Sequence, residues 1–161
     1  MRKVVIAALL SVFVAAPAVA ASGKNSVGIN YGLDYSGVFG LQGDFDISSS
    51  VDNAPISVQP FLKRGSETIF GTTYSITAVG VAGIYDLSSA FKVDRKVQPY
   101  AGLGIRRVTS SVANPLGGTL SASKSDLHIT LGAKYEFSPQ VSGDFNYNDF
   151  GGLTFGVVFG F

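Results

Sequence analysis

The final segment of the chain alternates between large apolar side chains and smaller residues, mostly glycine and threonine. Its apolar positions are Leu153, Phe155, Val157, Phe159 and Phe161. A period of two is the signature of a β-strand with one apolar face. We therefore predict that the chain ends in such a strand, with Phe161 as its last residue.

The same kind of ending occurs earlier in the chain, as an aromatic residue with another apolar residue two positions later. The four endings are Phe45/Ile47, Tyr85/Leu87, Tyr135/Phe137 and Phe159/Phe161. In the first three a serine follows at once, where a turn begins. The segment that follows the first turn, residues 58–61, also recurs as residues 97–100. The chain therefore repeats a hairpin unit, and four units predict eight antiparallel strands.

We expect the strands near residues 26–34, 38–48, 56–64, 73–88, 97–108, 125–138, 140–148 and 152–161. An even number of antiparallel strands of about 10 residues is typical of a bacterial outer-membrane barrel. A soluble β-sandwich is the alternative, but its strand ends would not repeat one aromatic residue at one level. The predicted fold is an all-β, eight-stranded antiparallel up-and-down transmembrane β-barrel.

The beginning of the chain reads as an export signal. Arg2 and Lys3 precede an apolar core, and residues 18–20 form an A-x-A cleavage site. We predict a signal peptide over residues 1–20, with cleavage after Ala20 or Ala21, and one barrel domain over residues 21–161. Export and an even strand count predict the bacterial outer membrane, with both termini on the periplasmic side.

The composition after the signal excludes several classes of site. Without Arg2 and Lys3 the chain has ten basic and eleven acidic residues, a net charge of −1, so nucleic acid is not an expected partner. The chain has no cysteine and one histidine, which argues against a structural zinc site. Gly102 and Gly104 are followed by no predicted helix, so no phosphate-binding loop is implied. We predict no metal and no cofactor.

Alternation assigns polar residues to the inside of the barrel. An eight-stranded barrel is just wide enough for side chains to fill it, so these residues form either a polar core or a narrow ion path. Lys134 and Asp144 fall on neighbouring strands at similar levels, so we expect them to pair. The inward candidates are Asn30, Gln42, Asp44, Asp46, Gln59, Lys63, Asp86, Gln98, Arg106, Lys134, Glu136, Asp144 and Asn146.

One strand breaks the alternation, because Tyr74 and Ile76 are out of phase with Val79, Val81 and Tyr85. Either a β-bulge restores the phase, or Tyr74 and Ile76 point inward near the outer rim.

The repeated aromatic residues predict two girdles at the membrane interfaces. The periplasmic girdle would contain Phe45, Tyr85, Tyr135, Phe137, Phe159 and Phe161, and the outer one Tyr31, Tyr35, Phe39, Tyr147 and Phe150.

Two outer loops carry polar residues. The longest runs from about Thr109 to Lys124 and is almost uncharged, and the second outer loop contains Lys63, Arg64 and Glu67. Arg64, Arg107 and Lys124 are candidate contacts for lipopolysaccharide phosphates, since arginine pairs well with phosphate. The alternative is that they are ordinary solvated charges at the rim.

The signal peptide, the eight strands, residues 99–104 (Pro-Tyr-Ala-Gly-Leu-Gly) and the terminal Phe161 together resemble the opacity-protein and OmpA-like family of small outer-membrane barrels. The resemblance implies that the barrel-assembly machinery reads the final strand through Leu153, Phe155, Val157, Phe159 and Phe161. Relatives include adhesins, membrane-stabilising proteins, narrow pores and lipid-modifying enzymes, so the fold does not choose among them. The first and fourth outer loops are shorter than is usual in the adhesive relatives.

We expect a monomeric barrel with a structural or surface-interaction role and no catalysis, in contact with outer-membrane lipid and lipopolysaccharide. The alternatives are a narrow low-conductance pore, an adhesin that uses the loop from Thr109 to Lys124, and a lipid-A-modifying enzyme centred on His128. Leu127 and Ile129 are apolar, which turns His128 toward the lumen, and Ser125 and Asp126 form no convincing triad with it.

Overall fold

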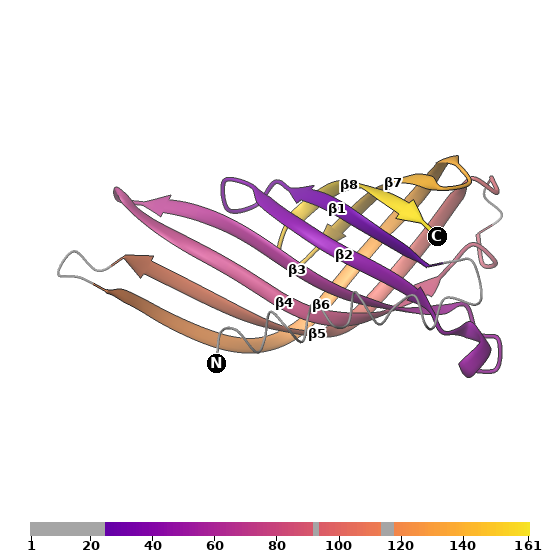
Figure 1. The fold of residues 1–161 in the computed structure, drawn as a ribbon, viewed down its shortest axis with the longest axis horizontal. Helices are drawn as coiled ribbons and strands as arrows, with labels where there is room; N and C mark the ends of the chain where they lie inside the picture. Colours follow the sequence, from indigo (N-terminus) through magenta and orange to yellow (C-terminus); the bar gives the residue numbers. More distant parts are fainter. Residues whose placement is uncertain (1–24, 92–93, 114–117) are drawn as a thin grey trace.

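The computed structural model of the chain describes residues 25–91, 94–113 and 118–161. Its strands form one closed antiparallel barrel in chain order, with β1 paired to β8 (Figure 1). The strands are β1 (Ser26–Gly32), β2 (Val38–Asp46), β3 (Ile56–Ile69), β4 (Thr72–Asp86), β5 (Val97–Ala113), β6 (Thr119–Ser138), β7 (Val141–Asn148) and β8 (Gly152–Gly160). The fold predicted from the sequence is confirmed.

The barrel wall is apolar outside and polar or small inside. In β1, Val27, Ile29 and Tyr31 are exposed on the outer face, whereas Ser26 and Asn30 are buried inside. This order is the reverse of that in a soluble domain, which buries its apolar residues. It suits a barrel whose outer face meets lipid and whose interior is packed with hydrogen-bonded side chains.

Most of the predicted girdle residues lie on the outer face. Tyr85, Tyr135, Phe137, Phe159 and Phe161 are exposed there, as are Tyr31, Phe39 and Tyr147. Phe45 has the same phase but is only 9% exposed. The assignment of Phe150 to the outer girdle is wrong, because its side chain is 2% exposed and lies inside the barrel, where it packs against the half-buried Tyr35.

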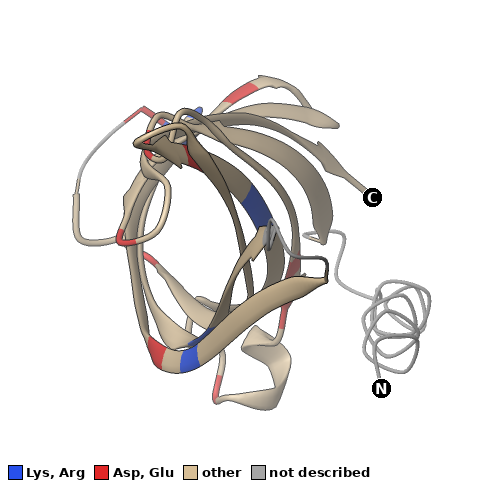
Figure 2. Ribbon diagram, turned by 90° about the vertical axis from the view of Figure 1, so that its left-hand side faces the viewer, with Lys and Arg blue, Asp and Glu red and all other residues tan. Residues whose placement is uncertain are grey.

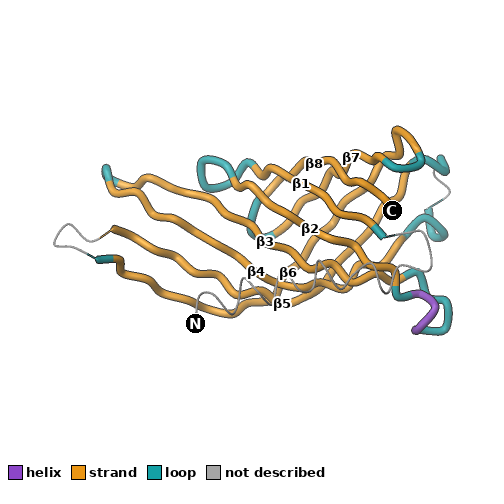
Figure 3. Tube along the Cα trace, viewed as in Figure 1, coloured by secondary structure: helices purple, strands orange, loops and turns teal. Residues whose placement is uncertain are grey.

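The two ends of the barrel differ in shape. At the terminal end, Ser26 pairs with Gly160 and the chain termini of the barrel lie together. At the opposite end, here the hairpin end, β3 to β6 extend well beyond the other strands (Figures 1 and 3). Pairing between β2 and β3 ends at Val38 and Gly65, whereas β3 and β4 stay paired to Ile69 and Thr72. We call the projecting four-stranded sheet, residues 66–77 and 109–125 without 114–117, the wing.

The wing corrects the expectation of long irregular loops. β5 continues to Ala113 and β6 begins at Thr119, so most of the predicted loop from Thr109 to Lys124 is paired strand. Lys63, Arg64 and Glu67 likewise belong to β3, and a tight turn at Phe70 and Gly71, both with positive φ, closes its hairpin. Serine and threonine take the place of large apolar residues on the outer face of the wing, so its strands lack the apolar alternation that marks a lipid-facing strand in the sequence.

No bulge separates the two halves of β4. Its register with β3 is continuous from Ile56–Tyr85 to Ile69–Thr72. Ile76 is 8% exposed and packs inside the barrel against Val38, Ala78 and Phe150. The inward alternative for Tyr74 and Ile76 is therefore the one that the structure adopts.

The predicted signal peptide and its cleavage site lie outside the described residues. Among the residues that are described, no helix is long and apolar enough to cross a membrane.

Candidate functional site

The middle of the lumen is organised around two buried carboxylates, and Asp144 on β7 is the first. Tyr100 Oη donates a hydrogen bond to Asp144 Oδ1 at 2.7 Å, and Gln42 Nε2 donates to Oδ2 at 2.9 Å. Asn146 Nδ2 donates a longer bond of 3.3 Å to Oδ2. Gly132 leaves room for the Tyr100 ring, because a Cβ there would lie 2.8 Å from the ring Cζ. Asp144 thereby ties β2 and β5 to β7.

Asp44 on β2 is the second buried carboxylate. Lys134 Nζ forms an ion pair with its Oδ2 at 2.9 Å, and Gln59 Nε2 donates to its Oδ1 at 2.8 Å. The predicted pair between Lys134 and Asp144 is wrong, although the two residues are register partners. The long lysine side chain reaches across the lumen to Asp44, while three neutral donors already satisfy Asp144.

The half of the lumen toward the hairpin end is filled by side chains. Asp149 Oδ1, in the loop between β7 and β8, lies 2.7 Å from both Arg106 Nη1 and His128 Nδ1. The His128 ring packs on Phe61 with 4.4 Å between ring centroids. Beyond this layer, Phe150 covers the apolar cluster of Val38, Ile76 and Ala78.

The loop that carries Asp149 and Phe150 is itself held in place. Asn148 Oδ1 accepts hydrogen bonds from the backbone N–H groups of Phe150 and Gly151, at 3.2 and 2.8 Å. Asn148 Nδ2 donates to Thr154 Oγ1 at 2.9 Å. We call residues 149–151 the plug, because they fold into the barrel that Figure 2 shows from its hairpin end.

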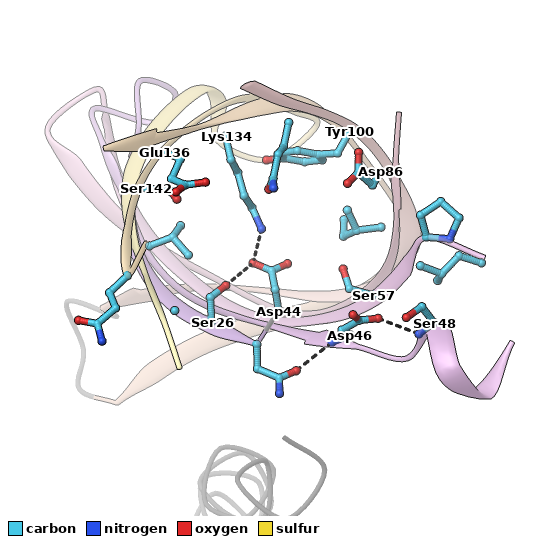
Figure 4. A pocket seen from close by; sticks show the side chains of 18 of the residues that line it. Ser26, Asp44, Asp46, Ser48, Ser57, Asp86, Tyr100, Lys134, Glu136 and Ser142 are labelled. Atoms are coloured by element: carbon cyan, nitrogen blue, oxygen red, sulfur yellow. Dashed lines mark hydrogen bonds and ion pairs between the residues drawn. The ribbon is translucent and has the colours of Figure 1, made fainter. Parts of the chain in front are cut away.

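The terminal end, in contrast, holds an open cavity of about 300 Å³ (Figure 4). Four carboxylates line it, those of Asp44, Asp46, Asp86 and Glu136, together with one lysine, Lys134. Asp46 and Asp86 also accept hydrogen bonds from the backbone N–H groups two residues ahead, at Ser48 and Ser88. The repeated aromatic-Asp-apolar-Ser sequence therefore builds the same turn twice, with its carboxylate at the lumen mouth.

The predicted inward residues all lie on the lumen side. Asp46, Asp86, Gln98 and Glu136 line the cavity, and Arg106 and Lys134 make the ion pairs described above. The others are buried: Asn30, Gln42, Asp44, Gln59, Lys63, Asp144 and Asn146. Within the described residues, no group of three or more His, Cys, Asp or Glu side chains could hold a metal ion.

His128 is buried in the lumen, as the sequence predicted, and Ser125 is not brought to it. Ser125 is exposed and lies in the outer phase of β6, whereas His128 lies in the inner phase. Asp126 forms an ion pair with Lys124 at 2.8 Å, and the carboxylate at His128 is that of Asp149.

The candidate lipopolysaccharide residues divide between the two faces of the sheet. Arg64 and Arg107 are exposed on the outer face at the base of the wing, two strands apart. Lys124 is 73% exposed in its side chain but lies on the inner, concave face, in register with Val108. The structure therefore places the two arginines on the same face of the sheet and the lysine on the other.

The outer face of the wing, which we call the hydroxyl face, consists almost entirely of serine and threonine. Cross-strand pairs include Thr68 with Thr73 and Thr109 with Ser123, whose hydroxyl oxygens are 3.1 and 2.9 Å apart. The members of this face are Ser66, Thr68, Thr73, Ser75, Thr77, Thr109, Ser111, Thr119, Ser121, Ser123 and Ser125.

The proposed assembly residues form the outer face of β8. Leu153, Phe155, Val157 and Phe159 are exposed there, and Phe161 follows the end of β8 and is exposed as well; β8 pairs with both β1 and β7. The geometry presents them as one continuous apolar row. Their role in assembly stays a prediction.

Sequence reasoning missed the plug and the phenol of Tyr100. A signal for the plug was present, because Phe150 shares the phase of the inward Asn146 and Asn148. The two glycines after Phe150 also permit a loop short enough to turn inward.

Comparison with known proteins gives one family and several similar structures. The profile of the outer membrane protein β-barrel domain matches residues 5–156. Neisserial surface protein A superposes with a TM-score of 0.61 at 18% identity, covering 86% of this chain and 95% of that one. The N-terminal barrel of Pseudomonas aeruginosa OprF gives 0.59 at 14%, with coverages of 86% and 98%. Ail of Yersinia pestis gives 0.55 at 17%, with coverages of 86% and 99%. No curated protein sequence matches this chain.

Proposed function

The chain belongs to the family of outer membrane protein β-barrel domains, and from this premise we propose that it holds an interaction surface, the wing, at the surface of the bacterial outer membrane. Family and fold place the barrel in that membrane. The barrel supplies the anchor, and the wing supplies the part that meets other molecules.

The length of β3 to β6 supports this proposal. These strands have 14, 15, 17 and 20 residues, whereas β1, β2, β7 and β8 have 7 to 9. A tilted strand needs only about 9 to 11 residues to cross a bilayer. The excess carries hydroxyl side chains on its outer face, so it stands in water beyond the lipid.

The orientation follows the same reasoning. Bacterial barrels have their longer excursions on the extracellular side. The longest excursion here is the wing, and the paired ends of β1 and β8, at Ser26 and Gly160, lie at the other end of the barrel. We therefore place the wing outside the cell and both termini, with the acidic cavity, in the periplasm.

Partners at the membrane follow from charge and exposure. Arg64 and Arg107 stand where the outer face changes from apolar to polar, and we assign them to lipopolysaccharide phosphates. Ail, which shares the fold, has been solved with the heparin analogue sucrose octasulfate, so a barrel of this shape does hold a polyanion. The apolar row from Leu153 to Phe161 is our candidate signal for the barrel-assembly machinery, and the barrel acts as a monomer.

Neither conduction nor catalysis is part of this proposal. Phe61, His128 and Phe150 fill the hairpin half of the lumen. In planar bilayers we expect the folded protein to stay silent, and reproducible single-channel steps would favour the pore. A His128-dependent change in lipid A, seen by mass spectrometry, would favour the enzyme.

The test of the surface role uses a strain that lacks the gene, complemented with the full chain or with a chain whose wing is shortened. We expect the full chain alone to restore surface binding, measured as cell adhesion, while both chains restore resistance to detergent. Equal adhesion with both chains would refute the role of the wing. The control is an equal amount of each protein in the outer membrane, shown by the gel shift between boiled and unboiled samples.

A further inference from the structure

We propose that the hydroxyl face of the wing is a docking surface for the sugar chain of lipopolysaccharide. This inference rests on the proposed function, because it requires the wing to stand outside the membrane. The partner is a carbohydrate, and its binding surface is the outer face of the wing.

Along β3 to β6, from the barrel toward the tip of the wing, the side chains of the outer face change in three steps from apolar to charged to hydroxyl-bearing. The first step is apolar, with Leu103, Ile105 and Leu127 each more than 60% exposed. Arg64 and Arg107 mark the second step, where the hydroxyl face begins beside them: Arg107 is in register with Ser125, and Arg64 with Thr77. The remainder of the hydroxyl face, beyond Arg64, is the third step. Lipopolysaccharide has the same order: acyl chains, then phosphates, then sugars. The hydroxyl face is therefore continuous with the surface that meets lipid.

Register sets the hydroxyls in rows across the sheet. Ser75, Ser111 and Ser121 form one row, and Thr77, Thr109 and Ser123 form the next. Neighbours are about 5 Å apart across strands and about 7 Å apart along them. Where two hydroxyls bond to each other, one O–H and several lone pairs stay available. Such an array offers both donors and acceptors, as sugar hydroxyls require.

The concave face of the same strands has a different composition. Tyr74, Val112 and Leu120 are register neighbours there, and Lys124 pairs with Asp126. Serine and threonine are therefore concentrated on the one face that continues the lipid-facing wall. If both faces met only water, they could have the same composition.

A polypeptide is the weaker candidate for this face. Protein interfaces concentrate their affinity in buried aromatic and arginine anchors. The hydroxyl face offers only small side chains, and its two arginines lie at the base, where phosphates are expected. A phospholipid headgroup would meet the arginines and the row of Thr77, Thr109 and Ser123 beside Arg64, but would not reach the next row, that of Ser75, Ser111 and Ser121.

The experiment measures lipopolysaccharide binding to the full protein in phospholipid nanodiscs by native mass spectrometry. Two probes share one lipid A: lipopolysaccharide with a complete core oligosaccharide, and a truncated form with only the two innermost sugars. The test variant is T109V/S111A on the hydroxyl face. Its matched control, T72V/S110A, removes the same groups from the concave face of β4 and β5. The conservative variant T109S keeps the hydroxyl.

We expect the unmodified protein to bind the complete form more tightly than the truncated one. Each lost hydrogen bond weakens binding several-fold, so T109V/S111A should reduce the preference roughly ten-fold. T72V/S110A and T109S should keep the preference, and R64Q/R107Q should weaken both probes alike. The gel shift establishes that each variant is folded.

Equal binding of both probes by the unmodified protein would overturn the inference, as would equal losses in the test and control variants. If the sugar preference fails but the wing still supports adhesion, the proposed function stands and the partner of the wing is a polypeptide. If shortening the wing leaves adhesion unchanged while the sugar preference holds, the adhesive role fails and the sugar site remains.

Discussion

The two sides of the barrel wall are built from the same kind of strand but end differently. On the short side, β7, β8, β1 and β2 stop near the rim, and the plug after Asn148 folds back into the lumen. On the long side, β3 to β6 continue into the wing. One chain thus closes its barrel on one side and extends it on the other.

The residues of the two sides differ in what surrounds them. Residues of the short side face lipid outside and a packed lumen inside, so both faces of each strand are specified. Asp144 alone receives three hydrogen bonds there. Most residues of the wing are exposed, whereas Ile76 at its base is buried, and its strands are held by backbone pairing and cross-strand hydroxyl contacts. We therefore expect substitutions to cost more on the short side.

The largest effect should follow Gly156→Val at the closure of β8 on β1. A Cβ at Gly156 would collide with the backbone carbonyl of Ile29 and lie 2.9 Å from the Cβ of Asn30. We expect a loss of about 3 kcal/mol or more in unfolding free energy, measured by urea titration of the protein in vesicles.

Gly83→Val on β4 is the control for Gly156→Val, because it makes the same substitution where the added side chain has room. Its Cβ would meet only the Leu103 carbonyl, at 3.9 Å, on the lipid-facing surface. We expect a change within about 0.5 kcal/mol. Similar losses at the two glycines would show that the close backbone contacts around Gly156 do not determine the cost.

Asp144→Ala should have the next largest effect. It leaves the Tyr100 hydroxyl and the Gln42 and Asn146 amides without their acceptor inside the lumen, at a cost of about 3 kcal/mol. Asp126→Ala removes a carboxylate that pairs with the exposed Lys124, where about 0 to 1 kcal/mol is expected. Urea titration of both variants measures the two losses in unfolding free energy. Equal losses would show that burial of the carboxylate does not determine the cost of removing it.

Asp149→Ala tests the plug. It removes the shared acceptor of Arg106 and His128, and we expect a loss of about 1 to 2 kcal/mol, since Asp149 is partly exposed. Hydrogen exchange should become faster at residues 149–151 and stay unchanged in the wing. Unchanged exchange at the plug would mean that the Asn148 contacts suffice to hold it.

Shortening the wing should have the smallest effect on stability. The two-residue turn Asn-Gly replaces residues 66–75 and also residues 111–121, so that Gly65–Ile76 and Ser110–Ala122 become the last pairs. We expect the barrel to keep its gel shift and to lose less than about 1 kcal/mol, because the lumen contacts are untouched. Failure to fold would show that the wing contributes to forming the barrel.

The strand number and the two faces of the wall were predictable because lipid imposes a period of two. The number of hairpins followed from the repeated strand endings at Phe45, Tyr85, Tyr135 and Phe159. Alternation placed His128 and Lys63 inside the barrel. The wing was not predictable in the same way. Ser110 and Ser111 lie on opposite faces, yet no difference in side chain marks them, and the outer face of β5 and β6 carries no large apolar residue in the described part of the wing.

The lumen partners were predictable only in part. Register made Lys134 and Asp144 neighbours, but a lysine in a narrow barrel can reach several strands. Which carboxylate it pairs with depends on the donors that the others already have. The sequence contains Tyr100 and Gln42, but only the closed ring shows that both point at Asp144.

The wing has no hinge where it leaves the barrel, because its strands are the strands of the wall. A pull on the tip of the wing in the strand direction therefore acts along strands that continue into the wall. Such a load shears many backbone hydrogen bonds at once, whereas a load across the sheet would open them one after another. A load along the strands would therefore pass from the wing into the wall with no joint between them.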